Sequence, residues 1–288
     1  MEGAGIKEEF YQFIHNTGLA SFIADKCPQH LELTKTFTKK FKYFSRESRV
    51  SFNLYDHSFT MPLEMFSDAC KLPYEGSFDE PTKFDYASFL VNLCFGEDRG
   101  VAQGRINSIH FPSRQYFALF NGKCIVGKQD CSTLCAHDLS LLHTTITGNK
   151  DYNLGAIVAR RLQLNAASGN FYGGIYASRV AERLNVSPWR NDPILPTQYL
   201  DFHAMKHHKF LTGTATNYTY NLRFYKKLVV PVVLPAPALF DFHTRGRYYV
   251  LESEAYEYNA EVEAARRAAE SAPRFSISHR PDYYSYGW

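Results

Sequence analysis

Residues 49–76 have the sequence RVSFNLYDHSFTMPLEMFSDACKLPYEG, which carries the clearest pattern of secondary structure in the chain. Apolar side chains recur at every second position from Val50 through Phe52 to Leu54, and the alternation resumes at Phe59 and Met61. The polar pair at positions 56 and 57 offers a turn between the two runs. A period of two on both sides of a turn is typical of a β-hairpin, so we predict one over residues 50–61.

A helix is expected directly after this hairpin. Thr60 is its predicted N-cap, and Pro62 is tolerated in a first helical turn because the N–H that proline lacks would have no partner there. The predicted apolar face consists of Leu63, Phe66 and Cys70. Leu72-Pro73 should end the helix. Hairpin and helix can then pack together as one α+β unit.

Three more helices are predicted farther along the chain. The first is capped by Asp138 and ends at Gly148, the second is capped by Asn153, and the third covers residues 175–184. The second helix has an apolar face made of Leu154, Ile157, Val158 and Leu162. In the third, Arg179 and Arg183 are four residues apart and share a face different from the apolar one.

Short strands are predicted around residues 109–126, where Phe117, Leu119 and Ile125-Val126 are expected to be buried. The fold class that follows is α+β: a predominantly helical globular domain with a β-hairpin, a few short strands and a flexible C-terminal tail.

Four regions are expected along the chain. Residues 1–49 form a helical lead-in, whose first helix over residues 7–33 is interrupted near Gly18 and stopped by Cys27-Pro28. Residues 50–211 form the central domain. Residues 212–240 are predicted to be a linker interrupted by prolines, and residues 241–288 a polar helix followed by a disordered tail.

Composition restricts the function classes. Of 288 residues, 32 are Lys or Arg and 29 are Asp or Glu, a formal net charge of +3, so a basic binding site has to be local. The longest apolar run, residues 228–240, is too short to span a bilayer and contains three prolines. Because the first nine residues lack a secretory signal pattern, we expect an intracellular protein of the nucleus or cytoplasm that is neither secreted nor bound to a membrane.

The strongest basic patch lies between positions 35 and 49. Its cationic residues are Lys35, Lys39, Lys40, Lys42, Arg46 and Arg49. Lysines that neutralise phosphates, combined with aromatic rings that stack on unpaired bases, suit the binding of single-stranded RNA or DNA. The alternative is that Phe37, Phe41 and Phe44 form the buried stripe of an amphipathic helix whose lysines lie in water.

Other candidate chemistry is weaker. Cysteines and histidines cluster between positions 124 and 143, but their spacing does not match a structural zinc site. His203 and His207 make an incomplete metal site, and Gly173-Gly174 before a helix is explained equally well by a turn or by an anion-binding loop. No motif for a catalytic nucleophile is present. We therefore predict no catalytic residue, metal, cofactor or small-molecule substrate.

A series of ordered phrases resembles a known family. Besides the opening stretch, these include FALFNGKCIVGKQDCSTL, YNLGAIVARRL, GGIYASRVAERL and ILPTQYLDF. They resemble the plant transposon protein domain found in retrotransposon-derived sequences of grasses, which looks related to the gag-like first reading frame of Athila-type elements. The hairpin, the helix and KLPYEG are also distantly similar to the plant mobile domain.

This resemblance implies a retrotransposon-derived, gag-like structural protein without enzymatic activity, which acts through protein or nucleic-acid contacts and can self-associate. The family supplies no catalytic or ligand residue to transfer. An alternative is a domesticated protein-interaction module without nucleic-acid binding, and a third interpretation is an inactive transposase remnant.

Overall fold

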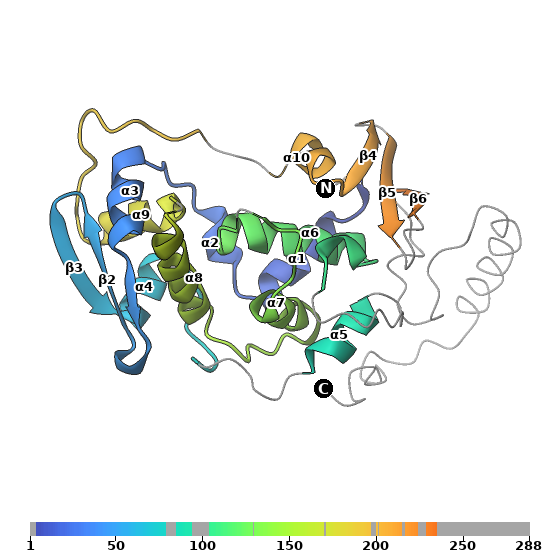
Figure 1. Cartoon of the computed structure of the whole chain (residues 1–288), viewed down its shortest axis with the longest axis horizontal. Coiled ribbons are helices and arrows are strands. Elements are labelled where there is room, and N and C mark those ends of the chain that lie inside the picture. Colours follow the sequence, from blue (N-terminus) through green and yellow to red (C-terminus); the bar gives the residue numbers. More distant parts are fainter. Residues whose placement is uncertain are drawn as a thin grey trace, which may run out of the picture.

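The computed structural model describes residues 4–78, 85–93, 104–128, 130–169, 171–196, 200, 202–214, 217–223 and 229–234. Within these ranges the chain has the expected α+β fold, with helices predominating and two three-stranded antiparallel sheets (Figure 1). The sheets lie at opposite ends of the described part of the chain and helices fill the space between them (Figure 1). The predicted tail, residues 241–288 with its polar helix, lies outside the described residues. No helix in the described ranges is long and apolar enough to cross a bilayer.

The predicted hairpin is confirmed. It consists of β2 (Arg49–Leu54) and β3 (His57–Pro62), paired in antiparallel register with Leu54 opposite His57. Tyr55 begins the two-residue turn with a φ of 53°, a left-handed conformation. The expected alternation holds, because Val50, Phe52 and Leu54 are all buried. A third strand, β1 (Lys42–Phe44), was not predicted; it pairs with β2 on the side away from β3.

Helices cover the inner face of this first sheet (Figure 1). They are α3 (Leu31–Lys40), α4 (Leu63–Ala69) and α8 (Leu154–Ser168), and α9 (Gly174–Arg183) packs against α3 and α4. The ring of Phe37 on α3 lies 5.2 Å from that of Phe52 on β2, and the ring of Phe41 lies 5.8 Å from that of Phe66 on α4. Burying each ring contributes about 2 to 3 kcal/mol, so these contacts bind the helices to the sheet.

Two predicted N-caps are wrong and one is confirmed. Thr60 belongs to β3, because the strand ladder continues to Pro62 and Pro62 itself precedes α4. Helix α7 (Ala136–Thr147) begins three residues before its expected start, with Cys135 as N-cap and Asp138 completing a capping box from inside the first turn. Asn153 caps α8 as expected, accepting a hydrogen bond from the Ala156 N–H at 2.9 Å.

Helices α1 (Lys7–Asn16), α2 (Ala20–Ala24), α6 (Pro112–Phe120) and α7 form the centre of the molecule (Figure 1). The predicted break near Gly18 is present, with a φ of 71°, and α2 ends before Pro28. The strands predicted over residues 109–126 are wrong: α6 continues into a π-helical turn, η4 (Asn121–Ile125). All residues of α6 are buried, including the polar residues Ser113, Arg114 and Gln115, so polarity in the sequence does not indicate which residues of this helix are exposed.

A second sheet lies where a linker was predicted. Strands β4 (Leu211–Thr214), β5 (Asn217–Arg223) and β6 (Val229–Val233) pair in that order, beside α10 (Phe202–His207). The linker prediction is therefore wrong over these strands. The linker was predicted because of prolines such as Pro231, but Pro231 lies in β6, which is an edge strand, and a proline is tolerated there. The Tyr220 hydroxyl donates to the Ile109 carbonyl at 2.7 Å and binds the sheet to the centre of the molecule.

One hydrophobic core extends through the whole described structure, from Ile6 to Leu234, and includes Phe89 of α5 (Tyr86–Leu93). The expected boundary between the lead-in and the central domain, at residues 49 and 50, does not separate two packed units, because β1 and β2 pair across it.

Arg179 of α9 is also part of the interior, with only 2 % of its surface exposed, whereas Arg183 is exposed. The guanidinium of Arg179 donates to the carbonyls of Phe22, Asp25 and Cys70 at 2.7 to 2.9 Å. The two arginines line the same groove beside α9, as expected for residues four apart, but only Arg179 reaches buried carbonyls and is itself buried.

Candidate nucleic-acid interface

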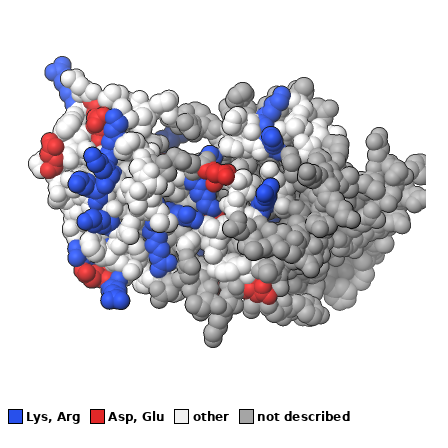
Figure 2. Space-filling view, in the orientation of Figure 1, with Lys and Arg blue, Asp and Glu red and all other residues white. Residues whose placement is uncertain are grey.

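The basic residues predicted from the sequence lie on four consecutive elements. Lys35, Lys39 and Lys40 are on α3, Lys42 is on β1, Arg46 is in the short 3-10 turn η2 (Ser45–Glu47), and Arg49 begins β2. Figure 2 shows Lys and Arg side chains gathered over the end of the molecule that contains α3 and the first sheet, with a few acidic side chains at the margins. We call the six residues the basic stripe.

Two members of the basic stripe are neutralised locally. Lys35 forms an ion pair with Glu32 at 2.7 Å, one helical turn earlier. Arg49 pairs with Glu47, and its guanidinium lies 4.2 Å from the centre of the Phe44 ring. Both cations are therefore less available to an external anion.

The other four residues of the stripe are Lys39, Lys40, Lys42 and Arg46. All four are exposed, and none forms an ion pair or hydrogen bond with another side chain among the described residues. We call them the free cations. Their charges remain available for a negatively charged ligand.

The aromatic residues of the stretch have a different role. Phe37 and Phe41 are buried, as predicted for the face of an amphipathic helix. The prediction is wrong for Phe44, which lies on β1 and is half-buried under Arg49, because α3 ends at Lys40. These three rings are therefore not free to stack on bases, and any stacking surface has to come from elsewhere in the chain.

A residue distant in sequence caps the helix that carries three of the stripe lysines. The carboxylate of Asp192 accepts the backbone N–H groups of Glu32 and Leu33, at 2.8 and 3.0 Å, and the Tyr55 hydroxyl at 2.8 Å. Burial alone would raise the pKa of Asp192, but these three hydrogen bonds favour the charged form and lower it. Burial raises the pKa of Tyr55 to about 12. Sequence analysis did not identify either residue.

Two hydrogen bonds attach α8 and the loop before α9 to the basic stripe. Gln163 of α8 accepts the N–H of Tyr43 at 2.6 Å, next to Lys42. The Thr38 hydroxyl donates to the carbonyl of Tyr172 at 2.7 Å, next to Lys39. The side chains adjacent to these contacts, Leu164 and Phe171, are 57 % and 59 % exposed. Their isolated positions gave no sequence signal for this site.

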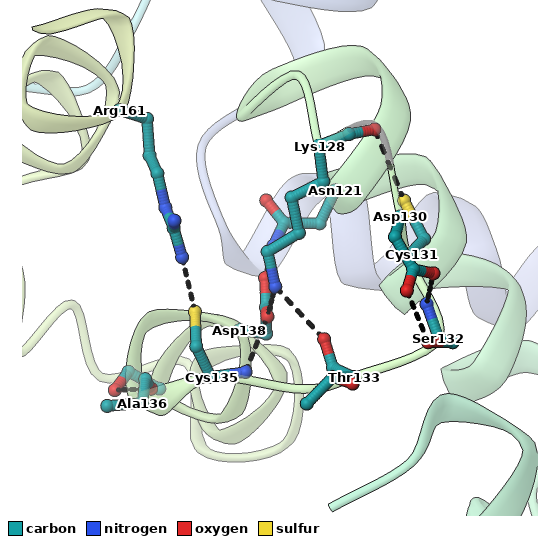
Figure 3. Close-up of polar contacts among 11 residues, drawn as sticks. Asn121, Lys128, Asp130, Cys131, Ser132, Thr133, Cys135, Ala136, Asp138 and Arg161 are labelled. Atoms are coloured by element: carbon teal, nitrogen blue, oxygen red, sulfur yellow. Dashed lines mark hydrogen bonds and ion pairs between the residues drawn. The ribbon is translucent and has the colours of Figure 1, made fainter. Parts of the chain in front are cut away.

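The cysteines and histidines between positions 124 and 143 do not converge. The sulfur of Cys135 contacts the Arg161 guanidinium at 2.6 Å, and that of Cys131 faces the Lys128 carbonyl at 3.8 Å (Figure 3). His143 lies 3.7 Å from the Asp151 carboxylate. No three His, Cys, Asp or Glu side chains in the described part of the chain form a group that could hold a metal ion.

Asp138 is the centre of the polar cluster in Figure 3. Its carboxylate pairs with Lys128, and it accepts the side-chain amide of Asn121 at 3.0 Å and the backbone N–H of Cys135 at 2.8 Å. These contacts join η4, the following loop and the start of α7. Burial raises the pKa of Cys124 to about 12, and burial also raises that of Cys131, so both thiols stay protonated at neutral pH.

The two remaining sequence candidates also have structural explanations. His203 and His207 both lie on α10, and the ring of His207 is 5.4 Å from that of His208; the side chain of His203 is outside the described residues. Gly173 has a φ of 117°, which favours glycine, and a Cβ on Gly174 would lie 2.4 Å from the Gln29 side chain. The turn and the close packing therefore account for the glycine pair.

A groove of about 720 Å³ lies between α2, α4 and α9. Its ionic lining residues are Asp25, Asp68, Glu182, Lys71, Arg179 and Arg183. Equal numbers of acids and bases give this groove no formal net charge, so it is less suited to a polyanion than the basic stripe.

No protein-family model, no curated protein and no solved structure matches the chain.

Proposed function

We propose that the protein is a non-enzymatic structural protein that contacts the phosphate backbone of a nucleic acid through the free cations. The observation that carries this proposal is the exposure of Lys39, Lys40, Lys42 and Arg46 without acidic partners among the described residues. The sequence resemblance to gag-like retrotransposon products supports a structural role in the nucleus or cytoplasm, where self-association would add further contacts.

Electrostatics supports a phosphate ligand. The formal net charge of the whole chain is only +3, yet the free cations alone concentrate four positive charges within eight residues. Each phosphate that a cation neutralises on a single strand releases counterions, which contributes about 0.7 to the slope of log affinity against log salt. Four contacts therefore give a slope of about 2.8.

The contacts of one buried carboxylate and the protonation of two thiols support the non-enzymatic part of the proposal. The Asp138 carboxylate is occupied by Lys128, Asn121 and the start of α7. The Cys124 and Cys131 thiols are protonated because burial raises their pKa values. These groups stabilise the central helices, which is a structural use.

The test measures binding of a labelled oligonucleotide across a salt series. Replacing Lys39, Lys40 and Lys42 by Gln leaves Arg46 as the last free cation, so the slope should fall from about 2.8 to about 0.7. A control variant with the same change of charge replaces Lys26, Lys71 and Lys206, which are also exposed, and should keep the original slope. Equal slopes for the two variants would contradict the proposal.

A second candidate function is a protein-interaction module. Two exposed apolar side chains favour it, Trp189 at 49 % and Ile194 at 67 %, both on the segment after α9. Co-purification with a partner that is lost on changing Ile194 to Ser, together with no salt-dependent oligonucleotide binding, would favour this candidate.

A further inference from the structure

Phe171 is a large apolar side chain in an unusual position. It lies in the connection between α8 and α9, and 59 % of its surface is exposed. Contact with water is unfavourable for so large an apolar ring, so a ligand that covers it would gain binding free energy.

The backbone beside Phe171 is attached to the helix of the basic stripe. The carbonyl of Tyr172 accepts the Thr38 hydroxyl at 2.7 Å, and Lys39 and Lys40 follow Thr38 directly. The Tyr172 hydroxyl donates to the Cys124 carbonyl at 2.7 Å, which fixes the same residue from its other end. Phe171 therefore precedes a residue that is fixed at two points, one of them on the helix that carries Lys39 and Lys40.

A second exposed apolar side chain is attached in the same way. Leu164 is 57 % exposed and follows Gln163, which accepts the N–H of Tyr43 at 2.6 Å. Tyr43 in turn follows Lys42. Two exposed apolar residues thus belong to the segments that hydrogen-bond to the backbone or side chains next to the free cations.

We propose that Phe171 stacks on an unpaired base while Lys39 and Lys42 contact the adjacent phosphates, so that the stripe selects single-stranded nucleic acid. This inference rests on the proposed function and adds the ligand class. An aromatic ring beside cations can bind a single strand because every base has a face on which it can stack. In a duplex those faces are already stacked, and only the phosphates are accessible.

The test compares two labelled oligonucleotides of equal length at the same salt: oligothymidylate, and a deoxyribose-phosphate strand without bases. Wild-type protein should bind oligothymidylate about tenfold more tightly, because base stacking on an aromatic side chain is typically of this size. Phe171→Ala should lose this factor for oligothymidylate and leave binding of the abasic strand unchanged. Phe171→Tyr should restore it, whereas Phe171→Leu, which keeps apolar bulk without a ring, should not.

Tyr11→Ala is the matched control, since Tyr11 is an aromatic residue on α1 that is 50 % exposed and lies outside the stripe. It should change neither affinity, and thermal melting should show that every variant is folded. Equal binding of both strands by wild type, with Phe171→Ala unchanged, would overturn the inference while the salt slope still supports the proposed function. No binding of either strand would overturn both.

Discussion

The hydrogen bonds of Asp192 allow a quantitative prediction of how much this residue contributes to stability. Its carboxylate is 8 % exposed and accepts two backbone N–H groups at the start of α3 together with the Tyr55 hydroxyl. Asp192→Ala removes a helix cap, at a cost of about 1 kcal/mol. It also leaves a buried hydroxyl without its acceptor, at a cost of about 1 to 3 kcal/mol. We expect the free energy of unfolding to fall by about 2 to 4 kcal/mol in total.

Urea denaturation at pH 7 measures this loss. Asp192→Asn keeps one acceptor oxygen but removes the charge, so it should cost less than Asp192→Ala. Combining Asp192→Ala with Tyr55→Phe removes the orphaned hydroxyl, so Asp192→Ala should cost less in that background than in wild type. Asp56→Ala, at an exposed aspartate in the hairpin turn, is the control and should change stability by less than about 0.5 kcal/mol.

The lowered pKa of Asp192 determines the pH dependence. A carboxyl group whose folded pKa lies below its unfolded pKa stabilises the protein fully above the unfolded value, about 3.9 for aspartate. This contribution is lost as the pH falls through the folded pKa. The stability difference between wild type and Asp192→Asn should therefore be constant from pH 7 to about 5 and shrink below pH 4. A loss under 0.5 kcal/mol for Asp192→Ala at pH 7, or a difference that grows in acid, would refute the reasoning.

Two further stability predictions follow from buried groups. Arg179→Met leaves the carbonyls of Phe22, Asp25 and Cys70 without their donor and should cost at least about 3 kcal/mol in urea denaturation; the same change at exposed Arg183 should cost under about 0.5 kcal/mol. Phe37→Ala should cost about 3 to 5 kcal/mol because that ring is fully buried. Phe44→Ala should cost about 1 kcal/mol, since the half-buried ring contacts mainly Arg49. Equal losses of stability for Phe37→Ala and Phe44→Ala would contradict the position of Phe44 on the outer face of β1.

Sequence patterns predicted the elements whose cause is local. The hairpin follows from alternation on both sides of a turn, and the start of α8 follows from an asparagine before an apolar face. The strand prediction over α6 failed because residues 116–120 form an apolar run of only five residues, and a run that short does not distinguish a buried helix from a buried strand. The second sheet was missed because Pro231 breaks the strand pattern, although its edge position tolerates it.

The candidate site was predictable only in part for a similar reason. The six cations are contiguous enough to be recognised, and the pair of Lys35 with Glu32 is a local contact one helical turn apart. The cap from Asp192 comes from a residue 160 positions away from Glu32, and the contact of Thr38 with Tyr172 spans 134 positions. No local pattern contains these partners, so the position of Phe171 beside the stripe required the tertiary structure.

The change of element at Phe41 explains how cations and core coexist in so short a stretch. Phe37 on α3 and Phe41 directly after this helix are four residues apart and face the core, while Lys39 and Lys40 between them are exposed. From residue 42 the period changes to two, so that Lys42 is exposed, Tyr43 is buried and Phe44 returns to the outer face. If the helix continued past Lys40, Phe44 would lie on the same face as Phe37 and Phe41 and would point toward the core. Lys42 would then point in a different direction from the one that it has on β1. Because the helix ends at Lys40, the chain presents exposed cations from α3, β1 and η2 in succession, above the core that Phe37, Phe41 and Tyr43 enter.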